Sequence, residues 1–208
     1  MIERAHFIFF VSILSLLSSC ITVNVPIGAG PDARATVWTV EPDPPGPSAA
    51  CNGLVVKVKD FSSSASVEGM GITVILEDGT LNRSGDNIWF ARPAEFLPDI
   101  LVKAMVETGA WGAVLRRSTV LDDDLVVEGY VRELGGRATE DGWEAVLDVD
   151  VTLLEGEGNA LLFQENYRFT WTLDSPGYAE LASAMDILVG IWCEEVMNDM
   201  ASSVAPIR

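Results

Sequence analysis

The side chains of this 208-residue chain that could do acid–base, nucleophilic or metal chemistry are one histidine, three cysteines and 31 carboxylates. The histidine is His6, close to the start of the chain. An imidazole is the usual base beside a nucleophilic serine or cysteine, so the fate of His6 decides whether such an arrangement exists. The sequence contains no G-x-S-x-G, G-x-x-x-x-G-K-[ST] or G-x-G-x-x-G pattern. The cysteines and carboxylates therefore remain as the candidates.

The first of the three cysteines follows a short apolar run. Phe7–Leu17 is apolar apart from two serines, and its eleven residues are about half of the roughly 20 needed to span a bilayer. Leu17-Ser18-Ser19-Cys20 comes directly after it and resembles the bacterial lipobox, in which the thiol is acylated before cleavage in front of it. We expect a lipoprotein signal peptide over 1–19 and lipidation, as palmitate, at Cys20. The alternative is an ordinary signal peptide cut near Ser19.

Removal of residues 1–19 changes which reactive side chains the mature chain carries. It takes out His6 together with one charge of each sign, so the mature chain keeps its net charge of −18 and has no histidine. Two or more acyl chains anchor a protein stably in a membrane. Ile21 stands where an aspartate would favour retention in the inner membrane, so we expect a lipid anchor on the periplasmic face of the outer membrane. Residues 20–32 are rich in glycine and proline and are expected to form a tether.

The remaining groups do not predict a catalytic or metal site. A chain this acidic would repel phosphate backbones, which excludes nucleic acid as a partner. Two thiols without histidine cannot complete a four-ligand zinc site. Asp122-Asp123-Asp124 could bind a hard cation, but we favour a solvated turn in front of a strand. Asp148 and Asp150 alternate with apolar residues, which indicates the outer face of a strand rather than a catalytic pair. We expect no enzyme, cofactor or metal, with an acid-based hydrolase as a distant alternative.

Cys51 and Cys193 are the two thiols left after lipidation of Cys20. A disulfide between them is possible in an oxidising compartment, where it would close a long loop and contribute about 4–5 kcal/mol in the chain-entropy model. The alternative, which we favour, is that Cys193 is a small buried hydrophobic residue and that Cys51 lies in a linker.

The elements that would position these residues follow from periodicity. In the first half, strands are expected over 33–40, 54–58, 72–76 and 86–90, with a proline-rich loop over 41–50, a serine-rich turn over 62–66 and a hairpin turn at Asp78-Gly79. Apolar residues from Phe96 to Met105 recur at helical spacing, and Gly109 is a stop signal.

The second half predicts a short strand over 113–116 and then three long ones. Those strands cover 125–134, 143–154 and 161–173, and together they are expected to form an antiparallel meander. The first of them is expected to end at Gly135-Gly136. A final helix carries an apolar stripe from Tyr178 to Val196, with Ser175 as its N-cap and Pro176 in its first position. The expected fold is α/β (or α+β): one layered domain over 33–202 with a mixed sheet of six to eight strands, two main helices and a tail over 203–208.

The order of these elements resembles the ABC-type transport auxiliary lipoprotein family. Besides Cys20 and the final helix, four stretches carry the resemblance: Val37–Pro42 (VWTVEP), Leu54–Val58 (LVVKV), Trp89–Leu97 (WFARPAEFL) and Leu125–Val131 (LVVEGYV). The resemblance implies a non-enzymatic accessory of lipid transport between the two membranes of Gram-negative bacteria. It also implies an MCE-domain (mammalian-cell-entry) periplasmic protein and an ABC transporter complex as partners. A homo-oligomer is possible.

Two other classes of function stay open. One is a lipid carrier with its own cavity, lined in part by tryptophans at 38, 89, 111, 143, 171 and 192. The other is a structural envelope-assembly lipoprotein that associates with outer-membrane barrels.

Overall fold

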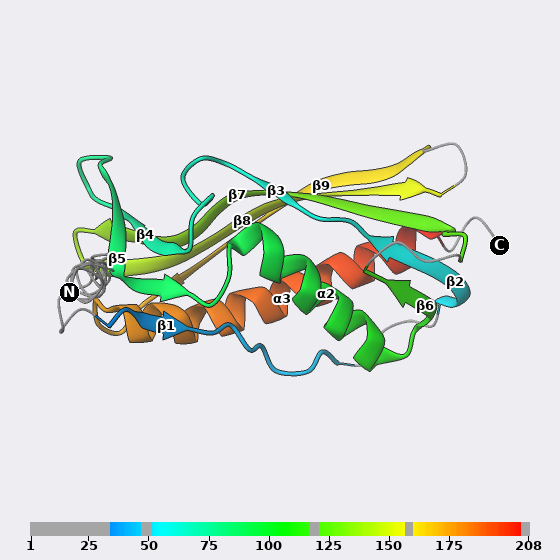
Figure 1. Ribbon diagram of the computed structural model, residues 1–208, viewed down its shortest axis with the longest axis horizontal. Helices are drawn as coiled ribbons and strands as arrows, with labels where there is room; N and C mark the ends of the chain where they lie inside the picture. The colour runs from blue at the N-terminus through cyan, green and yellow to red at the C-terminus, as the bar shows by residue number, and fades with distance from the viewer. Residues whose placement is uncertain (1–33, 47–50, 117–120, 157–159, 205–208) are drawn as a thin grey trace, which may run out of the picture. The chain divides into compact units, whose positions relative to one another are not determined.

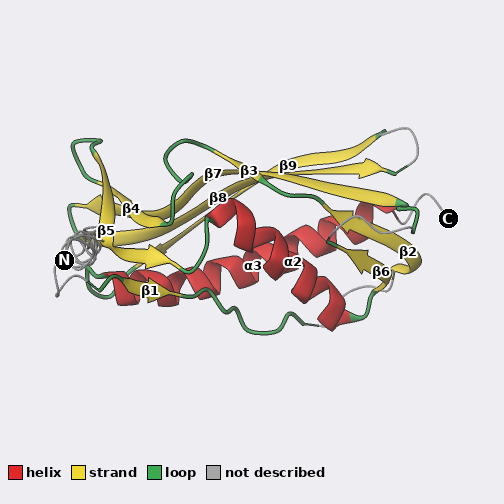
Figure 2. Ribbon diagram, viewed as in Figure 1, coloured by secondary structure: helices red, strands yellow, loops and turns green. Residues whose placement is uncertain are grey.

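The computed structural model describes residues 34–46, 51–116, 121–156 and 160–204, without the side chains of residues 51 and 52. The predicted signal peptide, Cys20 and the tether lie outside these residues. In the described part, nine strands form one mixed sheet and two helices pack on it (Figures 1 and 2). This confirms the mixed α/β fold. No helix among the described residues is both long enough and apolar enough to cross a membrane.

The sheet is organised around one long strand, β7 (Leu125–Thr139). On one side β7 pairs antiparallel with β8 (Gly142–Glu155), which pairs antiparallel with β9 (Leu161–Thr172). This is the predicted meander. Strict alternation over a half-buried surface is a local signal that a single segment carries by itself, which is why these strands were recognisable from sequence.

The other side of β7 is occupied by three strands in succession. These strands, all parallel to β7, are β2 (Cys51–Val58), β3 (Ser62–Ser63) and β4 (Gly71–Ile75), in chain order along its length. The two-residue strand β3 lies where a serine-rich turn was expected, and it brings the number of strands in the described residues to nine. Cys51 belongs to β2 and not to the expected linker.

The predicted end of the strand at Gly135-Gly136 is wrong, because β7 continues through both glycines to Thr139. Gly135 lies opposite Thr73 of β4, and a Cβ at Gly135 would collide with the Thr73 carbonyl oxygen. The glycine therefore permits close approach of a neighbouring strand rather than a turn. The actual turn is the two-residue connection between Thr139 and Gly142.

Two groups of shorter strands extend the sheet at opposite ends of β7. At one end β5 (Leu81–Trp89) pairs antiparallel with β4, across the predicted turn at Gly79, and β1 (Thr36–Trp38) pairs parallel with β5. At the other end β6 (Trp111–Leu115) pairs parallel with β2.

Both helices contact the same face of the sheet (Figure 2). Helix α2 (Pro93–Thr108) begins with a proline in its first turn and ends at Gly109, which has a φ of 60° as predicted for a glycine stop. Helix α3 (Tyr178–Val204) buries its apolar stripe, including Trp192, against β8, β9 and β7. The expected start of this helix at Ser175 and Pro176 is wrong. The Gly177 carbonyl accepts the first helical bond, from the Leu181 N–H, so glycine occupies the N-cap position.

The proline-rich segment 41–46 runs along α3 (Figure 1). The Glu41 N–H donates to Asp186 Oδ1 at 2.8 Å and the Gly46 N–H donates to Glu194 Oε1 at 3.1 Å. Burial of Asp186 raises the pKa of its carboxyl, and the bond from Glu41 opposes that rise. Helix α3 is thus held by this segment as well as by the sheet.

Candidate functional site

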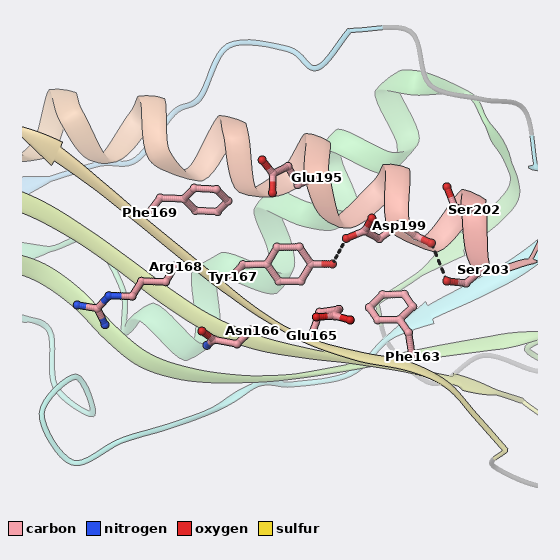
Figure 3. Close-up of a pocket in the computed structure, with 10 residues that line it drawn as sticks. All are labelled: Phe163, Glu165, Asn166, Tyr167, Arg168, Phe169, Glu195, Asp199, Ser202 and Ser203. Atoms are coloured by element: carbon pink, nitrogen blue, oxygen red, sulfur yellow. Dashed lines mark hydrogen bonds between the residues drawn. The ribbon is translucent and has the colours of Figure 1, made fainter.

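A groove of about 420 Å³ lies between β9 and the last turns of α3 (Figure 3). Ten residues line it: Phe163, Glu165, Asn166, Tyr167, Arg168, Phe169, Glu195, Asp199, Ser202 and Ser203. The first six belong to β9, and the last four lie on one face of α3. The groove therefore depends on the docking of the final helix against the last strand.

Alternation along β9 decides which side chains face the helix. Tyr167 is opposite Val149 of β8, and Phe169 is opposite Leu147, both of which are fully buried on the helix side of the sheet. Directly opposed residues share a face, so the odd-numbered residues of β9 from Phe163 to Trp171 point toward α3. Phe163 is the third aromatic residue in this row.

The phenol of Tyr167 joins the strand to the helix. Its hydroxyl donates to Asp199 Oδ2 at 2.7 Å, and only 5% of the residue is exposed (Figure 3). Burial raises the pKa of Tyr167 well above its ordinary value, and the negative charge of Asp199 adds to that rise. The tyrosine therefore stays protonated over the physiological range, and this bond fixes the position of the Asp199 carboxylate.

The charge of the groove is negative. Glu165, Glu195 and Asp199 are exposed along it. Arg168 belongs to the even-numbered row, and its side chain points away from α3 (Figure 3). Its guanidinium donates to Asp148 on the opposite face of the sheet. The hydroxyls of Ser202 and Ser203 donate to helix carbonyl oxygens four residues earlier. The groove thus offers carboxylates and aromatic rings, with its serine hydroxyls engaged in the helix.

The opposite face of the sheet carries a network of ion pairs. A β-bulge between Val131 and Glu133 interrupts the alternation of β7, as bulges do. Arg132 Nη2 lies 2.6 Å from Asp150 Oδ2, and this pairing lowers the pKa of Asp150. Glu133 accepts two bonds from Arg137, at 2.7 and 2.6 Å. Asp148 and Asp150 are therefore the structural carboxylates of a strand face, as their alternation indicated.

Among the described residues, Cys193 and the aspartate run lie in different parts of the fold. Cys193 is buried in α3 as a free thiol, and burial raises its pKa. The side chain of Cys51 and the whole of Cys20 lie outside the described residues. Asp124 Oδ2 accepts the Val55 N–H at 2.7 Å, and Asp123 lies 3.5 Å from Lys57, so both tie β2 to the start of β7. No group of three potential metal ligands occurs in the part of the chain that is described.

The six tryptophans belong to separate contacts. Trp89 packs edge-on to Phe96, Trp143 to Tyr178, and Trp192 to Phe61. Trp38 Nε1 donates to Asn87 Oδ1 at 3.1 Å. Trp111 is buried at the start of β6, while Trp171 is 43% exposed at the end of β9. The groove itself contains no tryptophan.

Sequence reasoning did not single out the groove residues. The row of aromatic residues at 163, 167, 169 and 171 has the spacing of one strand face, so this signal was present in the sequence. The partners Glu195 and Asp199 belong to the polar side of the final helix. Nothing in the sequence shows that this side of the helix lies beside that strand.

Solved structures share this mixed α/β fold. The chain is similar to protein XCC0632 from Xanthomonas campestris, with a TM-score of 0.74 and 16% identity, over 83% of this chain and 98% of that one. It is also similar to the hypothetical protein CT253 from Chlamydia trachomatis, with a TM-score of 0.51 and 11% identity, over 74% and 98% of the two chains. At these identities the likeness shows the fold alone. The chain has no match among curated proteins.

The sequence defines the class further. Residues 39–196, which run from the end of β1 into the C-terminal half of α3, match the family described as the ABC-type transport auxiliary lipoprotein component. The match covers most of the chain, and the chain therefore belongs to this family.

Proposed function

We propose that this protein is a non-enzymatic, lipid-anchored accessory component of an ABC/MCE-type intermembrane lipid transport system. The observation that carries the proposal is the family match over residues 39–196. The lipobox-like stretch ending at Cys20 lies upstream of that region and supports a lipid anchor.

In this proposal residues 1–19 are removed, Cys20 carries the acyl chains, and residues 20–32 connect the lipid to the folded domain. The lipid holds the protein at the periplasmic face of the outer membrane. The domain docks an MCE-domain periplasmic protein, and the ABC transporter complex supplies the energy. The net charge of −18 supports this arrangement, because it disfavours contact with anionic membrane surfaces and favours a partner with basic patches.

The anchor is tested by labelling cells with a palmitate analogue. The wild-type chain and Cys51→Ser should incorporate the label and fractionate with the outer membrane, whereas Cys20→Ser should incorporate none and leave the membrane fraction. The Cys51→Ser variant is the matched control because it removes a thiol and leaves the lipobox unchanged. Equal labelling of Cys20→Ser would show that the acylation site is elsewhere.

The partner is tested by cross-linking the labelled protein in cells, solubilising it and identifying what co-purifies. Recovery of an MCE-domain protein and of ABC transporter subunits supports the proposal. Recovery with outer-membrane barrels alone would favour an envelope-assembly lipoprotein. Mass spectrometry of extracted lipid separates a docking component, which should be empty, from a carrier. The native mass of the solubilised protein shows whether it is a homo-oligomer.

A further inference from the structure

The outer edge of β9 is long and has no partner in the described part of the chain. β9 pairs only with β8, and its twelve residues give an edge about 40 Å long at the usual rise per residue. The other described strands with a single partner, β1, β3 and β6, have three, two and five residues. Natural proteins usually keep edge strands short or cover them, because unpaired N–H and C=O groups accept a further strand. A long open edge therefore suggests a place for a partner.

The candidate groove runs beside this edge. Side chains of an added strand would alternate between the two faces of the sheet, and those on the helix side would extend over the groove. There they would meet the half-buried rings of Phe163 and Phe169 and the carboxylates of Glu165, Glu195 and Asp199. Aromatic faces next to carboxylates favour a side chain with an aliphatic stem and a cationic end.

Charge distinguishes between the two kinds of strand that could bind. A second copy of this chain would bring its own Glu165, Glu195 and Asp199 to the same edge, together with its own net charge of −18. Like charges placed together at an interface oppose association. A segment that carries lysine or arginine at alternate positions would place opposite charges over the groove.

We propose that β9 and the C-terminal half of α3 bind an extended, lysine- or arginine-bearing segment of a partner protein. The segment pairs with the free edge of β9 as an additional strand and places alternate cationic side chains over Glu165, Glu195 and Asp199. Backbone hydrogen bonds give the affinity and the alternate side chains give the selectivity, as in other cases of strand addition. The proposal names the surface used by the proposed function and rests on that function only for the identity of the partner.

The probe is a fluorescent decapeptide of alternating lysine and valine, titrated into the full-length lipidated protein in a non-ionic detergent and followed by anisotropy. We expect it to bind, and we expect a glutamate–valine decapeptide not to bind. Two further lysine–valine peptides carry N-methyl groups on alternate residues. In the first peptide the methyl groups block one edge of the strand, and in the second they block the other edge. Only one of the two should keep its binding, because a strand pairs through one edge. Equal binding of both N-methylated peptides would overturn strand addition.

The groove is tested by reversing charges on the protein. The double variant E165K/E195K should bind the lysine–valine peptide about tenfold more weakly or worse, since two attractions become repulsions. The matched control E140K/E180K has the same change in net charge at exposed residues of the β7–β8 turn and the first turn of α3. It should bind nearly as the wild type does, and circular dichroism reports whether each variant is folded. An equal loss in both double variants would reduce the effect to net charge and overturn the proposal.

Three results separate this proposal from the others. A native mass of two or more chains that falls when the lysine–valine peptide is added would show that a second copy occupies the edge, against our proposal. Peptide binding without recovery of any MCE-domain partner would contradict the proposed function and leave the surface assignment standing. Recovery of that partner equally well by wild type and E165K/E195K would support the proposed function and contradict the surface assignment.

Discussion

Gly129 of β7 occupies a position where one added methyl group should be measurable. The ring of Phe61 lies against this glycine and meets Trp192 of α3 edge-on, with centroids 6.2 Å apart and an interplanar angle of 86°. A Cβ at position 129 would be 2.5 Å from Phe61 Cε2. Phe61 and Trp192 are both buried, so the ring can move away only by disturbing the core.

The size of the effect follows from two opposed contributions. Replacing glycine by alanine where the backbone allows it stabilises a protein by about 0.4–1 kcal/mol through the unfolded state. Extra volume in a packed core destabilises by about 1–3 kcal/mol. The net expectation for Gly129→Ala is a loss of about 1.5 kcal/mol in the free energy of unfolding, which lowers the Tm by about 3–6 °C for a domain of this size.

The assay is differential scanning calorimetry of the full chain, with Gly85→Ala as the control. A Cβ at Gly85 would meet nothing within 4 Å, so this variant should melt at or above the wild-type temperature. Gly129→Ala should also be less damaging in a Phe61→Leu background, where the smaller side chain makes room. A Gly129→Ala protein that melts at or above the wild-type Tm would refute the assigned contact between Gly129 and Phe61.

Three further predictions concern ionisable groups. Asp186→Asn should stabilise the domain at pH 7 and lose this advantage below about pH 4. Burial raises the folded-state pKa of Asp186, so ionisation of this carboxyl opposes folding. Urea unfolding at the two pH values checks this. Tyr167→Phe should lower stability at neutral pH by about 1 kcal/mol. Above about pH 10 the wild type should lose this stability advantage over Tyr167→Phe. The phenol ionises there in the unfolded chain, whereas burial keeps it protonated in the folded one. The Cys193 thiol should be inert to a thiol reagent in the native protein and react in urea without reductant; a thiol that appears only after reduction would indicate the disulfide with Cys51.

The parts of the fold that were predictable are those whose signal is local. Strand β8 carries apolar residues at every second position from Trp143 to Leu153, and α2 ends at a glycine with the expected left-handed backbone. Gly135 and Gly136 were misread because glycine serves both at turns and where strands approach closely, and the neighbour that decides between them, β4, is about 60 residues away in sequence. The N-cap of α3 was misplaced by two residues, from Ser175 to Gly177.

The candidate site was less predictable than the fold. The aromatic row of β9 is visible in the sequence, but Tyr167 becomes a link only when Asp199 is placed 2.7 Å from its hydroxyl. From sequence alone, Arg168 would be counted as a positive charge of the groove. It is next to Tyr167 in the chain, and yet Asp148 holds its guanidinium on the other face of the sheet.

The pairing of β7 with three earlier strands determines the order in which this chain can fold. Val56 pairs with Leu125, Ser62 with Tyr130, and Thr73 with Gly135, so β2, β3 and β4 meet this partner only after more than sixty further residues. The β7–β8–β9 meander, by contrast, closes through short connections and is followed directly by α3. Local contacts form faster than distant ones. We expect the C-terminal half to form first and to serve as the template on which the N-terminal strands assemble. A chain interrupted before β7 would keep the β1–β5–β4 and β2–β6 pairings but would lack the strand that joins them into one sheet.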